Sequence, residues 1–206
     1  MAMTTREIAV PNHHAHYPGF AGLGGLLAAV SMVGRGSDAQ LVAELSGLRP
    51  TDAVVDVGCG PGTAVRHAAR RGARVTGVDP AAVMLRVARV LTRSSKARYV
   101  QGTAEHLPLP DASASVVWTI ASVHHWNDID MALREIARIL TPGGRFVAVE
   151  KVAQPGASGL GSHGWTQARA AAFADRCRDH GFIDPWIEQH TAGRRTTISV
   201  SARAGE

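Results

Sequence analysis

Short apolar runs alternate with longer amphipathic stretches through the middle of the chain. Residues 53–57, 74–78, 98–100, 115–120 and 146–149 are rich in β-branched and aromatic residues. Runs of this length and composition predict strands. Because most of them lack polar alternation, we expect strands that are covered on both faces, as in a parallel sheet.

The stretches between these runs carry apolar residues at helical spacing. Ser37 or Asp38 is placed to cap a helix before the first strand, and Asp128 to cap one after the fourth. Gly72 and the turn at 141–144 are placed to end helices. The residues predicted to face inward are Leu41, Val42, Leu45 and Leu48; Val65, Ala68 and Ala69; Val83, Val87, Val90 and Leu91; and Ile129, Leu133, Ile136 and Leu140.

The last quarter of the chain predicts one more helix and a hairpin. The helix runs from about Trp165 to His180 and is ended by Gly181, and residues 186–191 and 196–202 form the hairpin. Strands that alternate with helices imply a mainly parallel sheet with helices on both faces. The hairpin adds one antiparallel strand at the far end of the sheet.

The N-terminal segment differs from the regular pattern that follows it. Several histidines are followed by an apolar, glycine-rich run at 19–34. This run is too short to span a membrane and lacks the basic start and cleavage site of a signal peptide. We therefore expect a cap or lid segment at 1–36 and one domain at 37–206. Loose attachment to a membrane surface stays open.

The composition is that of a folded globular protein of one domain. The 206 residues are 45% hydrophobic and 19% charged, with a net charge of +5. The basic residues are scattered at positions typical of solvated helix faces, so nucleic acid is not the expected partner. Cys59 and Cys177 are too few for a disulfide framework or a zinc site and favour a reducing, cytoplasmic setting.

A glycine-rich turn follows the first strand and carries the main chemical signal. Gly58, Gly60 and Gly62 allow a sharp turn and close approach of the backbone to a ligand. The helix that follows offers free N–H groups to an anion. Asp79 ends the next strand, where it can accept hydrogen bonds from both ribose hydroxyls of a nucleoside or cap the helix after it. Asp56 can also organise the turn through backbone amides.

The spacing of the glycines separates two kinds of nucleoside site. A dinucleotide fingerprint needs its third glycine one residue after Gly62, where Thr63 stands. The run DVGCGPGT at 56–63 instead resembles the first motif of class I S-adenosylmethionine-dependent methyltransferases. The further matching segments are VDP at 78–80 with Met84, GTAEHLPLPD at 102–111, VHHWND at 123–128 and EIARILTPGG at 135–144.

The resemblance covers about residues 37–150 and points to the small-molecule methyltransferases that include the ubiquinone and menaquinone enzymes. It implies an α/β, Rossmann-like methyltransferase fold with a mostly parallel seven-stranded sheet, one antiparallel strand and helices on both faces. The implied cofactor is S-adenosyl-L-methionine. The implied cofactor-binding residues are Asp56, Gly58, Cys59, Gly60, Asp79, Pro80, Met84, Thr103, Ala104, Glu105 and Ile120.

Each matched residue has an implied role. Asp56 and the glycines lie along the methionine part of the cofactor, and Asp79 holds the ribose. Pro80 and Met84 flank the adenine. Ala104 and Glu105 face its edge, and Ile120 approaches the methionine group through its backbone.

The chain departs from the family pattern at two places. Thr103 stands where family members often have an Asp that contacts the adenine amine, a task that Thr performs only weakly or leaves to Glu105. Ala114 and Ser115 replace the usual Phe-Asp pair before the fourth strand. Because that position is structural, we expect reduced packing there without loss of activity.

The chemistry of transfer requires a nucleophile held in line with the activated methyl, and a base if the acceptor carries a proton. Histidine is best tuned for that task near neutral pH. His125 follows the fourth strand and is the candidate general base or acceptor-orienting residue; a structural histidine is the alternative. His124 is expected to point away.

The acceptor pocket is predicted to take residues from both ends of the chain. The candidates are His16, Tyr17, Phe20, Trp126, His163 and Trp165. Trp165 can equally belong to the core. A metal site at the N-terminal histidines needs converging ligands that close spacing alone does not supply, so none is predicted.

Absent motifs narrow the acceptor. No Asn/Asp-Pro-Pro-aromatic motif follows the fourth strand, where 120–122 is Ile-Ala-Ser, and no acidic cluster follows the fifth. The prediction is a methyltransferase acting on a small, partly apolar metabolite, with the methylated atom and the oligomeric state, a homodimer included, left open. Two alternatives stay open. The first is a binding or regulatory module that has the methyltransferase fold without activity and binds RNA through its basic faces. The second is a nicotinamide-dependent oxidoreductase.

Overall fold

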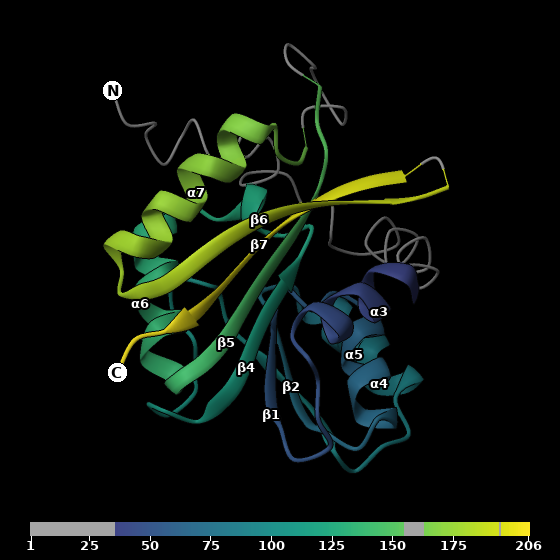
Figure 1. The fold of residues 1–206 in the computed structure, drawn as a ribbon. Helices are drawn as coiled ribbons and strands as arrows, with labels where there is room; N and C mark the ends of the chain where they lie inside the picture. The colour runs from purple at the N-terminus through teal and green to yellow at the C-terminus, as the bar shows by residue number, and fades with distance from the viewer. Residues whose placement is uncertain (1–35, 155–162, 194) are drawn as a thin grey trace.

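The computed structural model describes residues 36–154, 163–193 and 195–206, which fold around one seven-stranded sheet (Figure 1). The strand order is β3-β2-β1-β4-β5-β7-β6. The strands are β1 (Ala53–Val57), β2 (Arg74–Asp79), β3 (Ala97–Gln101), β4 (Ala114–Ile120), β5 (Leu140–Lys151), β6 (Phe182–Ala192) and β7 (Arg195–Ala204). All five predicted central strands and the closing hairpin are confirmed.

Among the described strands, β7 alone runs opposite to the direction that the other six share. It pairs antiparallel with β5 on one side and with β6 on the other, whereas the pairs from β3 through β5 are parallel. The α/β, Rossmann-like sheet with one antiparallel strand is therefore the fold that the sequence predicted. A positive φ of 48° at Asp184 and a register shift between Ile183 and Trp186 mark an irregularity early in β6.

Helices cover both faces of the sheet (Figure 1). They are α3 (Gly36–Leu45), α4 (Thr63–Arg70), α5 (Ala82–Leu91), the short 3₁₀ helix η1 (Val123–His125), α6 (Ile129–Ile139) and α7 (Gln167–Asp179). The alternating side chains of the strands explain the two layers. Val54 packs in the core cluster beneath α3 and α4, and its neighbour Val55 packs in the cluster beneath α6 and α7.

The helix caps agree only in part with the sequence prediction. The Asp128 side chain accepts the Met131 N–H at 2.9 Å and caps α6 as predicted. Ser37 and Asp38 instead lie within the first turn of α3, which already includes Gly36. The capping assignment for these two residues is therefore wrong.

The predicted inward face of α5 is wrong at Val90 and Leu91, whereas Val83 and Val87 are half-buried. Val90 is 80% exposed and Leu91 is 43% exposed, whereas Met84, Leu85 and Ala88 are buried. The helix carries apolar residues on two faces, so helical spacing alone does not select the face that meets the sheet.

The Thr-Pro-Gly-Gly turn lies within the bounds of β5 instead of preceding the strand. Ala114 pairs with Leu140, and the next pairing joins Val116 to Arg145, so β5 advances by five residues while β4 advances by two. The three extra residues form an irregular loop at the start of the strand. Helix α6 ends immediately before it, at Ile139.

The two residues of the Ala114-Ser115 departure lie in different surroundings. Ala114 is fully buried. The Ser115 hydroxyl donates to Asp52 Oδ1 at 2.8 Å and accepts the Ala53 N–H at 3.1 Å. Arg145 contacts the same Asp52 carboxylate. Ser115 and Arg145 therefore share the Asp52 carboxylate in a partly buried polar network, and the expectation of reduced packing stays a prediction.

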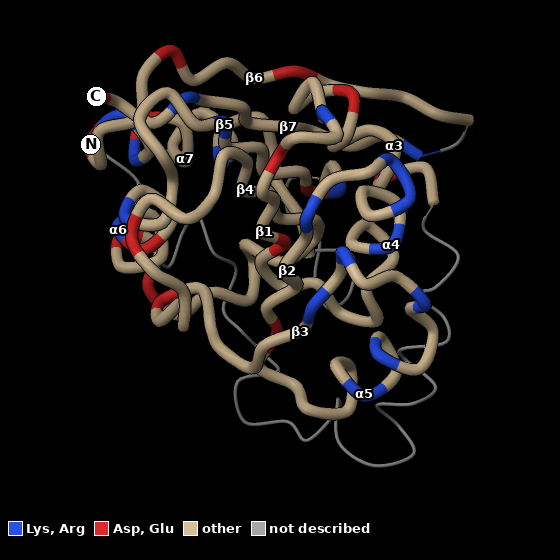
Figure 2. The backbone as a smooth tube through the Cα atoms, turned by 90° about the horizontal axis from the view of Figure 1, so that it is seen from below, with Lys and Arg blue, Asp and Glu red and all other residues tan. Residues whose placement is uncertain are grey.

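The charged residues follow the expected scattered distribution. Lys and Arg lie near α4, α5 and β3 as well as near α6 and α7, on both sides of the sheet (Figure 2). In 36–154 and 163–206, Arg194 aside, no helix combines the length and the apolar character that crossing a membrane requires. The predicted cap segment at 1–36 falls almost wholly outside the described residues, so the domain boundary stays a prediction.

Candidate functional site

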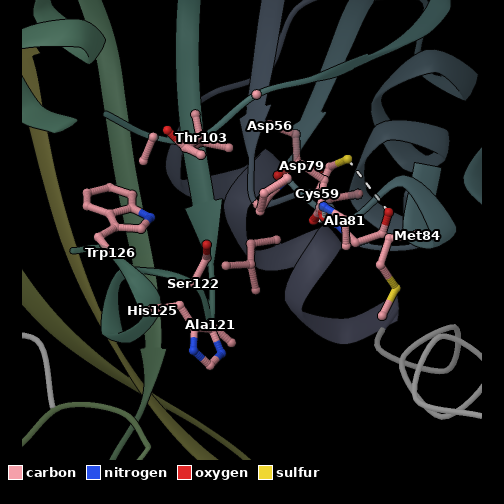
Figure 3. Close-up of a pocket in the computed structure, with 18 of the residues that line it drawn as sticks. Asp56, Cys59, Asp79, Ala81, Met84, Thr103, Ala121, Ser122, His125 and Trp126 are labelled. Atoms are coloured by element: carbon pink, nitrogen blue, oxygen red, sulfur yellow. Dashed lines mark hydrogen bonds between the residues drawn. The ribbon is translucent and has the colours of Figure 1, made fainter. Parts of the chain in front are cut away.

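A cavity of about 350 Å³ opens where β1, β2 and β4 end (Figure 3). The carboxyl ends of parallel strands in an open α/β sheet are the usual place for a ligand. All eleven predicted cofactor-binding residues line this cavity, as do His125 and Trp126. The sequence therefore identified one contiguous set of residues, although they come from five separate segments of the chain.

The glycine turn forms the floor of the cavity and leaves space above it. Gly58 has φ 75°, and a Cβ there would collide with the Ser122 side chain. Gly60 has φ 51° and lines the cavity, and a Cβ there would meet no protein atom within 4 Å. A side chain at this position would project into open space that a ligand needs. The turn therefore fits close approach of a nucleoside-bearing group.

Asp79 joins the end of β2 to the glycine turn. Its Oδ2 accepts the Gly60 N–H at 2.8 Å, and its Oδ1 accepts the Ala81 N–H at 2.9 Å. Burial raises the pKa of Asp79, and the two backbone hydrogen bonds partly oppose that rise. A carboxylate has about four acceptor positions, so this one keeps acceptor capacity for a ligand in the cavity.

Asp56 is a second carboxyl group behind the turn. It is 2% exposed. Burial raises the pKa of Asp56 to about 7, and the charge of Asp79 adds to the rise. Burial also raises the pKa of the Cys59 thiol, which suits a small packing residue and not a nucleophile. Two acidic groups with raised pKa values beside one cavity mark it as a candidate functional site.

The segment after β3 forms the opposite wall. Thr103 and Ala104 line the cavity, and Thr103 pairs with His106 in an isolated bridge. Glu105 also lines it, but its Oε1 accepts the Asn127 N–H at 2.7 Å and the Asp128 N–H at 3.3 Å. This carboxylate therefore links two walls of the cavity, a structural role that the resemblance did not imply.

The far end of the cavity is formed by the chain that leaves β4. Ala121, with φ 50°, and Ser122 lead into η1. His125 and Trp126 both line the cavity (Figure 3). His124 does not line it and instead contacts Glu150, as its predicted orientation away from the site requires.

The other predicted acceptor residues have separate outcomes. His163 lies beside His125, with ring centroids 5.7 Å apart. Trp165 is absent from the cavity lining, is 0% exposed, and stacks on Phe173 with centroids 4.7 Å apart. Its position favours the alternative of a core residue. The remaining three candidates, His16, Tyr17 and Phe20, lie outside the described residues.

Sequence reasoning missed two acidic residues near the site. Asp38 lines the cavity from α3, and its Oδ2 lies 2.7 Å from Arg195 Nη2 at the start of β7. Glu150 is buried at the end of β5 beside His124. A lone acid at the end of an apolar strand was the available signal for Glu150. Within the described part of the chain, no group of three or more His, Cys, Asp or Glu residues is arranged to hold a metal ion.

Comparison with known proteins identifies the family that the central part of the chain matches. Residues 55–148 match a family model described as a methyltransferase domain. The chain is 38% identical over 104 residues to a malonyl-[acyl-carrier protein] O-methyltransferase of Pseudescherichia vulneris, covering 50% of this chain and 40% of that protein. It is 40% identical over 97 residues to a ubiquinone/menaquinone biosynthesis C-methyltransferase of Rubrivivax gelatinosus, covering 47% and 38%.

A solved structure supports the fold over most of the chain. A SAM-dependent methyltransferase from Aquifex aeolicus superposes with a TM-score of 0.73 at 15% identity, covering 86% of this chain and 97% of that chain. The domain that residues 55–148 span belongs to the class I S-adenosylmethionine-dependent methyltransferase family. The chain spans less than half the length of the two curated relatives, at 40% and 38%.

Proposed function

We propose that this protein binds S-adenosylmethionine in the cavity and transfers its methyl group to a small, partly apolar acceptor. The observation that carries the proposal is the convergence of the glycine turn, Asp79 and His125 on one cavity of about 350 Å³. A volume of this order falls in the range of ligand sites. The family assignment of the domain supports the same reaction class.

The cofactor would lie across the glycine turn with its nucleoside toward β2. Asp79 would accept hydrogen bonds from the ribose hydroxyls, while Pro80 and Met84 would flank the adenine and Thr103 and Ala104 would face its edge. Pro80, Met84 and Ala104 are apolar and suit the faces of a base. Asp79 and Thr103 can accept hydrogen bonds from the hydroxyl and amine groups of a neutral nucleoside.

The methionine part would lie between the glycine turn and the end of β4. Asp56 and Asp79 would lie near a group that carries a cationic sulfonium and an ammonium, and this positive charge would favour their ionised forms against the rise in pKa that burial causes. Ionised carboxylates in a buried setting favour such a cation, since opposite charges interact more strongly away from water. Ile120 would approach the methionine part through its backbone carbonyl.

The cofactor supplies an electrophilic methyl group, so the protein must orient the acceptor and accept its proton where it has one. His125 is the side chain of the described cavity wall best suited to accept a proton near neutral pH. Ile120, Ala121 and Trp126 give this end of the cavity an apolar wall. A small acceptor with an apolar body and one polar reacting group fits these surroundings.

Calorimetry with the full chain tests the proposal. S-adenosylhomocysteine and S-adenosylmethionine are expected to bind with one-to-one stoichiometry, and NAD is expected not to compete. Methyl transfer is then assayed with radiolabelled cofactor against a panel of small phenols, quinols and carboxylic acids. The absence of cofactor binding at about 1 mM, a very weak affinity of roughly −4 kcal/mol, would refute the proposed function.

A further inference from the structure

Glu150 is a buried carboxylate that the cavity lining does not include. It is 1% exposed and follows Val149, which pairs with Ile120 at the end of β4. The Ala121 N–H donates to the Val149 carbonyl at 2.8 Å, so Glu150 lies beside the point where the chain leaves the sheet. A buried charge is costly unless it is hydrogen-bonded, and both oxygens of Glu150 are bonded.

The first oxygen holds the backbone of η1. Glu150 Oε1 accepts the Val123 N–H at 2.8 Å. The first N–H groups of a helix have no partner within the helix, and this carboxylate supplies one. The Trp126 N–H in turn donates to the Val123 carbonyl at 3.0 Å. Fixing Val123 therefore fixes the turn that carries His125 and Trp126 into the cavity.

The second oxygen holds the ring of His124. Glu150 Oε2 lies 2.9 Å from His124 Nδ1. This contact ties one ring nitrogen of His124 to the carboxyl group and so sets the ring orientation. The His124 and His125 ring centroids are 4.0 Å apart, and those of His124 and His163 are 5.0 Å apart. Glu150 therefore contacts His125 indirectly by two routes, one through the backbone and one through a ring.

We propose that Glu150 is a positioning residue for methyl transfer, which orients the His125 ring at the methyl end of the cavity through Val123 and His124. The proposal rests on the proposed function for its catalytic consequence. A misplacement of about 1 Å at a reacting group can cost on the order of 100-fold in rate. Glu150 itself does not touch the cavity and exerts its effect on the acceptor side, not on the nucleoside side.

Two variants separate the two routes. In Glu150→Gln the charge is lost, so the Val123 N–H meets a weaker, neutral acceptor. The new NH₂ group faces His124 Nδ1, which keeps the contact only if that nitrogen carries no proton. In His124→Asn the side-chain amide can still donate to Glu150, but the ring beside His125 is removed. Asp52→Asn is the matched control, because Asp52 is also a buried, hydrogen-bonded carboxylate. It lies just before the first residue of β1, whereas the cavity lies at the other end of that strand.

The first measurements need no acceptor. In Glu150→Gln we expect the Val123 amide to exchange with solvent about tenfold faster and the ring ¹⁵N signals of His125 to shift. In His124→Asn the Val123 amide should stay protected while the His125 ring signals shift. The affinity for S-adenosylhomocysteine should stay within about threefold of wild type in both variants, which corresponds to less than about 1 kcal/mol.

The kinetic measurement uses any panel acceptor that the wild type methylates. We expect kcat to fall about 10- to 100-fold in Glu150→Gln and less in His124→Asn, while Asp52→Asn keeps kcat within about twofold despite a lower melting temperature. Unchanged His125 signals in a folded Glu150→Gln variant, or an equal loss of kcat in Asp52→Asn, would overturn the proposal. If the wild type binds no cofactor, the proposed function fails, and the ring signals of His125 still decide whether Glu150 orients it.

Discussion

The substitution Asp79→Asn tests the ribose assignment with the least change in shape. Asn keeps one acceptor oxygen and replaces the other with an NH₂ group. That group must face either the Gly60 or the Ala81 N–H, or turn toward the cavity, because both N–H groups now donate to the Asp79 carboxylate. The variant therefore loses the charge and at least one hydrogen bond that the ligand or the glycine turn requires.

The expected loss of affinity follows from the hydrogen bonds involved. A hydrogen bond to a charged group contributes about 1.5–3 kcal/mol. If both ribose hydroxyls donate to the carboxylate, losing one bond and weakening the other costs about 3 kcal/mol. This corresponds to a roughly 100-fold weaker affinity for S-adenosylhomocysteine. The unfolding free energy of the ligand-free protein should change less than the affinity does. Burial raises the pKa of the Asp79 carboxyl, so removing this group offsets part of the lost hydrogen bonding.

Titration calorimetry with wild type, Asp79→Asn and Asp128→Asn measures this difference. Asp128 accepts one backbone N–H as the cap of α6 and does not line the cavity, and Asn caps helices as well as Asp. The control should bind like wild type. An Asp79→Asn variant that is folded and binds within about threefold of wild type, a difference below about 1 kcal/mol, would refute the ribose assignment.

Three further predictions concern the glycine turn, the buried acid Asp56 and the contacts that α6 makes with the segment after β3. Gly58→Ala should lower the unfolding free energy by about 1–3 kcal/mol in urea titrations and by more than Gly143→Ala, which has φ 69° but no neighbour within 4 Å of its Cβ. Because the folded-state pKa of Asp56 is raised to about 7 from 3.8, its burial cost is absent below about pH 4 and grows until about pH 7. Ligand-free wild type should therefore lose about 3 kcal/mol relative to Asp56→Asn between about pH 5 and about pH 8, and a constant difference would contradict the raised pKa. Arg138→Leu should cost about 2 kcal/mol of unfolding free energy, since Arg138 donates to the Leu107 and Leu109 carbonyls at 3.0 and 2.8 Å, and a melting temperature equal to wild type would contradict it.

The parts of the fold that sequence predicts are those set by local patterns. β1 was placed to the residue, because an apolar run ending at glycines has a single interpretation in an α/β protein. The residues that the family resemblance implied for the cofactor line one cavity, since the ends of parallel strands meet at one edge of the sheet, and their binding role stays a prediction. The inward face of α5 did not follow, because Val90 and Leu85 are equally apolar and only tertiary packing distinguishes them.

The contacts that sequence did not predict join segments far apart in the chain. The Arg195–Asp38 pair brings the start of β7 to the cavity wall, and the Glu150–His124 contact depends on the register of β4 against β5. No local pattern encodes such pairs, and one sequence gives no second signal for them. Trp165 shows the same limit, because its spacing fits both a pocket wall and the core that it occupies.

The central claim is that one cavity holds the cofactor nucleoside at Asp79 and the reacting methyl group at His125. A crystal structure of the full chain with S-adenosylhomocysteine measures this directly. The account predicts ribose hydroxyl oxygens about 2.7–3.0 Å from the Asp79 carboxylate, and the sulfur at the end of the cavity formed by Ile120 and His125. Ligand bound elsewhere, or bound with the ribose away from Asp79, would contradict it.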